Sequence, residues 1–244
     1  MKEVKVHRYK GNDIYFYENY YLKIAKKIID KEYEELVKIK DSKRNYVSLM
    51  KIDDTKYLYK EPRNEYRIPQ RQVMTFFKKG EVLSTLENIT NLIDKEGFID
   101  YVRPYLAIVK RKKRLIIFSS ILFEYIHNKG DSEEEDYDNI LEKIRLLHLK
   151  GYYHGDFNPS NFIKENNGNI RILDTQGKKM LFGNYRAHYD MLTMKMDSYQ
   201  DMIYPYKKNI FYYFAFFVKK FKRLKWIEKI KKKKKELRDK GWKI

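Results

Sequence analysis

The stretch that decides the fold is HGDFNPSNFIKENNGNIRILDTQG, residues 154–177. It opens with a short polar loop that contains Asp156 and Asn161. A brief apolar segment follows, then the turn NNGN at residues 166–169, and then a second apolar run that ends at Asp174. Asn and Gly tolerate positive φ, so this turn predicts a hairpin that brings Asp174 back beside Asn161.

An aspartate, an asparagine five residues later and a second aspartate at the tip of a strand form a set that phosphoryl transfer from a nucleotide requires. One carboxylate accepts the proton of an attacking hydroxyl, while a carboxamide oxygen and the other carboxylate hold the magnesium that bridges the phosphates. HxD or DxxG alone is weak evidence, whereas the ordered set with a hairpin between them is specific. The alternative is a polar surface loop followed by a structural hairpin.

These residues resemble the catalytic segment of the protein-kinase-like superfamily. The resemblance implies that Asp156 is the catalytic base and that Asn161 and Asp174 are the metal ligands. Two positions depart from the pattern: Gly155 stands where many protein kinases have Arg, and TQ at residues 175–176 replaces the usual Phe and its neighbour in the DFG element. Both departures are common in kinases that act on small molecules and sugars.

The composition limits where the protein works and what it binds. The 244 residues include no cysteine, which excludes disulfides and thiolate zinc sites. The first residues contain no apolar signal-peptide core, and the longest apolar run, residues 210–218, is too short to span a bilayer, so we expect a cytoplasmic protein. The net charge of +19 implies an anionic partner. Residues 219–244 contain 14 Lys+Arg and 3 Asp+Glu, so +11 of this charge lies in the tail.

The first half predicts a β-rich lobe. Two short strands in residues 4–17 and a helix at 20–34 precede strands at 35–40, 45–52 and 55–60. Lys60 lies near the end of the third of these strands, where a kinase-like fold has the lysine that pairs the α- and β-phosphates of ATP. The alternative is a solvated lysine at a strand end. Residues 38–48 contain no glycine, so Ser42, Lys43 and Arg44 would have to cover the phosphates in place of a Gly-rich loop.

A helix predicted at residues 71–88 contains two candidates for the carboxylate that holds Lys60. Glu81 is the first candidate, Glu87 is the alternative, and a solvent-facing Glu is the third reading. Residues 98–109 and 115–126 predict a strand pair that leads into an inter-lobe hinge. Backbone groups from Glu124 to Ile126 are expected to bind the adenine edge there.

The second half predicts helices at residues 133–150 and 184–199. Asp190, on the second of these, either anchors the catalytic loop or is a surface residue. The gap after Asp174 is too short for a peptide-holding activation segment, which favours a non-protein substrate. The five histidines show no metal-ligand spacing, and His148 and His154 are expected to be structural. The tail predicts a basic amphipathic helix that packs on the lobe, docks on anionic lipid or, least favoured, binds nucleic acid.

Together these features predict an α+β, bilobal protein-kinase-like fold, with a β-rich N-lobe over residues 1–127 and a mainly helical C-lobe with a basic C-terminal helix over residues 128–244. The chain also resembles the bacterial lipopolysaccharide core heptose(II) kinases. That resemblance rests on length, the basic C-terminus and six segments: KYLYK at 56–60, FEYI at 123–126, GD at 155–156 with NFI at 161–163, and IRILD at 170–174 with GK at 177–178.

This second resemblance implies ATP and Mg²⁺ as cofactors and a heptose of a lipid-anchored core oligosaccharide as acceptor. It also implies peripheral contact with the anionic inner face of the cytoplasmic membrane. Two other classes stay open: a kinase for another core sugar or small alcohol, and a pseudokinase-like binding module without turnover.

Overall fold

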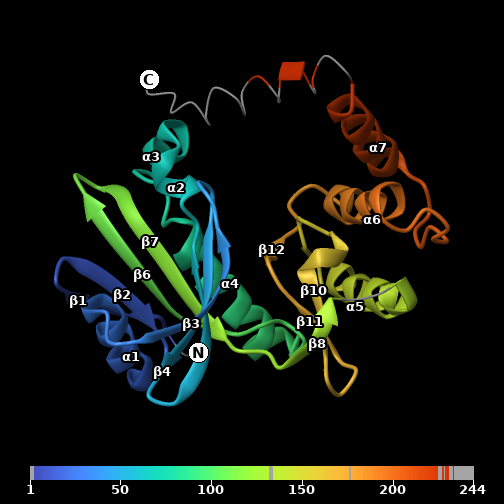
Figure 1. Ribbon diagram of the computed structural model, residues 1–244. Coiled ribbons are helices and arrows are strands. Elements are labelled where there is room, and N and C mark those ends of the chain that lie inside the picture. The colour runs from blue at the N-terminus through green and yellow to red at the C-terminus, as the bar shows by residue number, and fades with distance from the viewer. Residues whose placement is uncertain are drawn as a thin grey trace. The chain divides into compact units, whose positions relative to one another are not determined.

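The computed structural model describes residues 3–131, 134–175 and 177–224, with isolated positions 227, 229, 230 and 233 (Figure 1). The predicted helix start at residue 133, the departure at Gln176 and most of the basic tail lie outside these residues. The contact pattern divides the chain into two compact units. The first holds Met1–Asn91 with Val102–Ile126, and the second holds Leu92–Tyr101 with His127–Lys243. The chain is mixed α+β, with a mainly β sheet first and most helices later.

The first unit is built on one seven-stranded sheet, in which each pair of neighbouring strands is antiparallel. The strands predicted from alternating apolar residues are confirmed, with ends shifted by a few residues. In spatial order they are β1 (Lys5–Tyr9), β2 (Asn12–Phe16), β6 (Pro104–Lys112), β7 (Leu115–Glu124), β5 (Thr55–Glu61), β4 (Tyr46–Ile52) and β3 (Glu34–Asp41).

Each face of this sheet is covered by one helix (Figure 1). Leu106 and Ile108 of β6 pack with α1 (Asn19–Asp30), while the alternating Ala107 and Val109 pack with α4 (Glu81–Glu96). Successive side chains of a strand point to opposite faces, so one strand contributes to both cores. The near-continuous apolar run of β6 therefore reflects burial on both faces.

The single helix predicted at residues 71–88 is wrong. The structure has two short helices, α2 (Asn64–Arg67) and α3 (Pro69–Met74), and then the longer α4, which begins only at Glu81. Gly80 directly precedes α4 with a φ of +103°, which is not helical, and a Cβ there would lie 2.5 Å from Ile116 Cδ1, so the position requires glycine. Phe76 and Phe77, expected on the apolar face of one helix, are exposed instead.

The predicted strand over residues 98–109 also begins too early. Gly97, with a φ of +78°, ends α4, and the N–H of Phe98 donates to the carbonyl of Leu92. Strand β6 therefore starts at Pro104.

Among the residues that the structure describes, the second unit contains three longer helices and two small sheets. Gly151 ends the first helix as predicted, with a φ of +81°. The predicted turn also forms: Gly168 has a φ of +86° and joins β10 to β11 as an antiparallel hairpin. The elements are β8 (Asn128–Asp131), η1 (Glu134–Asp136), α5 (Tyr137–Leu149), β9 (Tyr152–Tyr153), η2 (Pro159–Asn161), β10 (Phe162–Glu165), β11 (Ile170–Ile172), β12 (Lys178–Lys179), α6 (Tyr185–Asp197) and α7 (Ile210–Lys222).

Helix α7 packs against α6. Ala215 and Lys219 are buried, whereas Phe217, Phe221 and Leu224 are exposed. The sequence left open whether these three side chains pack onto the lobe, and the structure shows that they do not. Within the described part of the chain, every helix is too short or too polar to span a bilayer.

Candidate active site

One buried carboxylate holds the start of the loop that begins at His154 through hydrogen bonds to its backbone. Asp190, on α6 and 1% exposed, accepts hydrogen bonds from the backbone N–H of His154 at 2.8 Å and of Gly155 at 3.2 Å. Of the two readings of Asp190, the anchor is confirmed. A carboxylate that accepts two backbone N–H bonds is a strong, charge-assisted tie, so α6 fixes the loop at its start.

Asp190 is itself oriented by a buried chain of polar side chains. His148 Nε2 lies 3.3 Å from Asp190 Oδ2, and His148 Nδ1 lies 2.7 Å from the Tyr206 hydroxyl. Because Asp190 is an acceptor, Nε2 donates and Nδ1 accepts from Tyr206. Each ring nitrogen of His148 thus has a hydrogen-bond partner, as expected for a structural histidine.

His154 ties the loop to the end of the hairpin. Its ring is fully buried; Nδ1 accepts the N–H of Asp156, and Nε2 donates to the carbonyl of Leu173 at 3.1 Å. Burial lowers the pKa of His154, against the opposing charge of Asp190, which favours the neutral ring that this bonding pattern requires. The structural role expected for His154 is confirmed.

Three residues predicted to carry the chemistry are brought together by this scaffold. The Asn161 side-chain amide donates to the carbonyl of Asp156 at 2.7 Å, and the carbonyl of Asn161 accepts the N–H of Leu173 at 2.8 Å. Asp174 follows directly, with a φ of +51° that few non-glycine residues adopt. Asp156 and Asp174 are both exposed, so their carboxylates can meet a ligand.

Thr175 has a structural role that the sequence did not reveal. It is 7% exposed, its hydroxyl donates to the carbonyl of His154 at 3.2 Å, and the same oxygen accepts the N–H of Gly177. The residue was noted only as a departure from the kinase pattern. Here it links the segment after Asp174 to the start of the loop that contains Asp156.

The donor set fits a hard divalent cation. The side-chain amide nitrogen of Asn161 donates to the Asp156 carbonyl, so Asn161 could offer its Oδ1 to a cation, and Asp174 could offer its carboxylate. Mg²⁺ prefers oxygen ligands and typically takes only one or two protein carboxylates together with phosphate and water. A site of three or more His, Cys, Asp or Glu is absent from the described residues, so a cage made only of those side chains does not form there.

In the first unit, Lys60 is the next-to-last residue of β5 and half-buried. It lies directly opposite Ile121 of β7, and Ile121 packs against α4. Residues directly opposite in an antiparallel pair share a face, so Lys60 lies on the face that α4 covers. Glu81 is the first residue of α4 and exposed, while the Glu87 carboxylate is bound by Lys79 at 2.9 Å. The choice between Glu81 and Glu87 as the partner of Lys60 stays a prediction.

Glu65 is the buried carboxylate of this unit, and the sequence gave no reason to choose it. It is 6% exposed, accepts the Ser119 hydroxyl at 2.8 Å and also accepts the N–H of Glu81. A carboxylate at the first turn of α4 satisfies a free N–H and complements the helix dipole. Glu65 thus fixes where α4, and with it Glu81, begins. No local signal marks it, because its partners are 16 and 54 residues away.

The expected hinge segment follows β7. Glu124 makes two hydrogen bonds with the backbone of Arg103. Its N–H donates to the Arg103 carbonyl, and its carboxylate accepts the Arg103 N–H at 2.7 Å. A contribution of Glu124 to an adenine edge therefore depends on its carbonyl oxygen. Ile126 is buried at the end of the unit.

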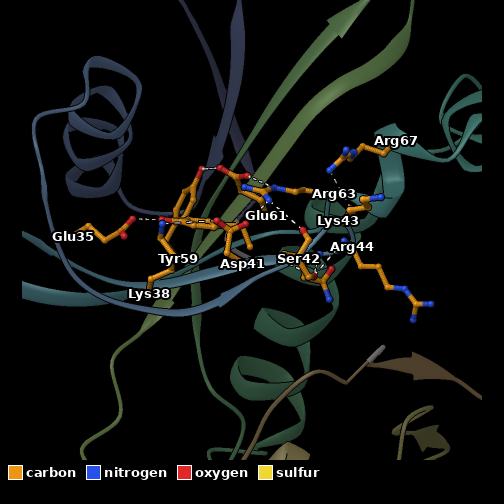
Figure 2. A network of polar contacts seen from close by, with 12 residues as sticks. Glu35, Lys38, Asp41, Ser42, Lys43, Arg44, Tyr59, Glu61, Arg63 and Arg67 are labelled. Carbon is orange, nitrogen blue, oxygen red and sulfur yellow. Dashed lines mark hydrogen bonds and ion pairs between the residues drawn. The ribbon is translucent and has the colours of Figure 1, made fainter. Parts of the chain in front are cut away.

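The glycine-free loop between β3 and β4 is a tightly bonded turn (Figure 2). The Ser42 hydroxyl donates to the Asn45 carbonyl and accepts the N–H groups of Arg44 and Asn45. Arg63 clamps the turn from outside: its guanidinium donates to Asp41 at 2.7 Å and to the Ser42 carbonyl at 3.1 Å. The Arg44 side chain extends away from this network in Figure 2. The turn is therefore held by fixed side chains and presents a cation.

No protein-family profile matches the chain. Over 81 residues it is 30% identical to CBL-interacting serine/threonine-protein kinase 24 of Arabidopsis thaliana and 32% identical to CBL-interacting protein kinase 8 of Oryza sativa subsp. japonica. Each match covers 30% of this chain and 18% of the relative. The chain spans less than a fifth of the length of these kinases, so the similarity supports distant kinase homology and, at most, a kinase-like phosphotransferase.

Proposed function

We propose that this protein is an ATP-dependent phosphotransferase with a bilobal protein-kinase-like fold and an alcohol acceptor. One observation carries the proposal: a single hydrogen-bonded scaffold unites Asp156, Asn161 and Asp174. A polar surface loop would not need a buried carboxylate and a buried imidazole to hold it. The distant similarity to two protein kinases supports the same class.

In this proposal Asp156 accepts the proton of the acceptor hydroxyl, which its exposed carboxylate on a fixed loop allows. Asn161 Oδ1 and the Asp174 carboxylate hold Mg²⁺. When bound, the ion neutralises charge that develops on the phosphates.

For the nucleotide, Lys60 would pair the α- and β-phosphates, with Glu81 orienting its ammonium. The carbonyl of Glu124 and the backbone of Ile126 would meet the adenine edge. The Arg63-clamped turn would cover the phosphates with the Arg44 guanidinium in place of glycine N–H groups. Arginine suits this task because its planar donors match phosphate oxygens.

The acceptor is proposed to be a sugar hydroxyl, and specifically a heptose of a lipopolysaccharide inner core. Residues 175–184 make up the whole connection from Asp174 to α6, and β12 in its middle pairs with β9. The N–H of Met180 also donates to the Gly151 carbonyl at 2.7 Å. A connection this short, and tied back on the unit, offers little surface to hold a peptide. The choice of heptose rests on the sequence resemblance alone.

The test is phosphate transfer from ATP to a dephosphorylated core oligosaccharide, read as the mass gain of one phosphate. Parallel reactions contain a different core sugar, a small alcohol or a generic peptide. We expect transfer to the oligosaccharide by the wild type, and a loss of about 10²–10⁴-fold in Asp156→Asn with nucleotide binding nearly intact. Asp201→Asn, at an exposed position, is the matched control.

Transfer to another acceptor would retain the phosphotransferase and reject the heptose. Nucleotide binding without transfer to any acceptor would instead identify a pseudokinase-like binding module. Single-turnover transfer by Asp156→Asn within a few-fold of the wild type would reject its role as base.

A further inference from the structure

Helix α7 presents a continuous apolar stripe to solvent. Seen along the helix axis, its side chains fall within roughly 100° of the circumference, because they recur at three- and four-residue spacing. The opposite side of the helix is the one that packs, through Ala215 and Lys219. The exposed fractions along the stripe are 77% for Ile210, 61% for Tyr213, 57% for Phe214, 65% for Phe217, 41% for Phe221 and 43% for Leu224.

The stripe continues into the loop before α6. Leu181 and Phe182 are 83% and 78% exposed, and the Tyr185 ring that follows this loop lies 5.1 Å from the Phe214 ring of the stripe. A Cβ on Gly183 would lie 2.5 Å from the Phe211 ring, which shows how closely the two segments approach. Contiguous apolar surface of this kind usually marks an interaction site.

Lys219 fixes which side of α7 faces outward. Its ammonium lies inside the unit, 2.6 Å from the Asp197 carboxylate at the end of α6, and its side chain is 6% exposed. The ion pair with Asp197 and the buried Ala215 hold one face of the helix inward. The apolar stripe is therefore exposed because of this packing and not because the helix is loose.

Cations flank the stripe, and acidic residues are absent from α7 itself. Lys207 and Lys208 precede the helix, and Lys220 lies beside the stripe. The chain from residue 221 onward adds 12 Lys+Arg against 3 Asp+Glu. A wide apolar face with basic flanks is typical of helices that lie in the plane of a membrane surface.

We propose that the outer face of α7, with Leu181 and Phe182, docks on the surface of an anionic lipid bilayer. The apolar side chains enter the boundary between headgroups and acyl chains, and the flanking lysines meet acidic headgroups. A nucleic acid would satisfy the lysines but offers no apolar phase for six exposed side chains. The docking does not depend on phosphoryl transfer. If the acceptor is lipid-anchored as proposed, docking would concentrate the enzyme at the inner face of the cytoplasmic membrane, where that acceptor lies.

The test is co-sedimentation of the full chain with vesicles of phosphatidylcholine alone, or with about one quarter phosphatidylglycerol, at low and high salt. Phe214→Gln with Phe217→Gln removes the centre of the stripe at positions that are already exposed, so the fold should survive. We expect this variant to lose at least about tenfold in partitioning at both salt concentrations. Lys207→Gln with Lys208→Gln and Lys220→Gln should lose affinity mainly at low salt.

The matched control is Leu146→Gln with Leu149→Gln, which changes two exposed leucines on α5 and should bind as the wild type does. Circular dichroism checks that each variant is folded. The proposal is overturned if the stripe variant sediments as the wild type does, or if the control loses as much as the stripe variant. Self-association of the wild type through the stripe, without vesicle binding, would also overturn it and identify a protein interface.

Discussion

The clearest test of the catalytic-loop scaffold is Asp190→Asn. This change keeps the size and shape of the side chain, but it removes the charge and replaces one acceptor oxygen with an NH₂ group. Asp190 accepts from three donors: the N–H of His154, the N–H of Gly155 and His148 Nε2. An asparagine can keep at most one oxygen toward these donors.

The magnitude follows from the donors that are left over. If the amide oxygen takes the Oδ2 position, it keeps the contacts with the N–H of His154 at 2.8 Å and of Gly155 at 3.3 Å. The NH₂ group then replaces the Oδ1 acceptor 3.2 Å from the Gly155 N–H and opposes that donor. A buried donor with a poor partner costs up to about 1–3 kcal/mol, and the remaining bonds lose the contribution of the charged acceptor. We therefore expect Asp190→Asn to lower the free energy of unfolding by about 2–4 kcal/mol.

The measurement is urea denaturation followed by far-ultraviolet circular dichroism, with Asp201→Asn as an exposed control. The control should change the free energy of unfolding by less than about 0.5 kcal/mol. Phosphoryl transfer by Asp190→Asn should also fall, because the loop that positions Asp156 is displaced. A variant as stable and as active as the control would refute the anchoring role.

Three further predictions concern other parts of the chain. Gly80→Ala should lower the free energy of unfolding by about 1–3 kcal/mol more than Gly11→Ala. Both glycines have positive φ, but only a Cβ at position 80 would meet Ile116. Equal losses of stability in urea denaturation would contradict this. Burial lowers the pKa of His154, so the unfolded chain takes up its proton first and stability falls as pH drops below about 6.5, by at most about 1.4 kcal/mol per pH unit. His154→Asn should flatten the slope between about pH 5 and pH 6.5, and an unchanged slope would assign it to other groups. Arg63→Gln should speed amide exchange in residues 42–45 and weaken ATP binding severalfold, as calorimetry would measure; unchanged exchange would mean that the turn holds itself.

The strands and most helices could be predicted because their patterns are local. Alternating apolar residues gave β4 and β5 nearly to the residue, and the Asn-Gly turn gave the hairpin around Gly168. The prediction failed at residues 71–88, where Phe76 and Phe77 continue a helical pattern through a break. Gly80 is a weak breaker on its own, and its close contact with Ile116 is visible only once the sheet is formed.

The candidate site divides in the same way. Asp156, Asn161 and Asp174 follow from spacing, because one loop and one hairpin suffice to bring them together. The residues that hold the site depend on contacts between distant parts of the chain. Thr175 was noticed only as a departure from a pattern, and Glu65 not at all, since neither its burial nor its bond to Ser119 leaves a trace in the local sequence.

The structure separates the residues that would act from the residues that hold them. Asp156 is exposed and ends a chain of buried contacts that runs through His154 to Asp190. Changing the exposed end should therefore alter chemistry without altering stability, while changing the buried end should alter both. A binding module that keeps the fold without turnover would show only the loss of stability when the buried end is changed. The comparison of Asp156→Asn with Asp190→Asn thus distinguishes a phosphotransferase from such a module, because a scaffold that positions nothing has no exposed residue whose loss stops a reaction.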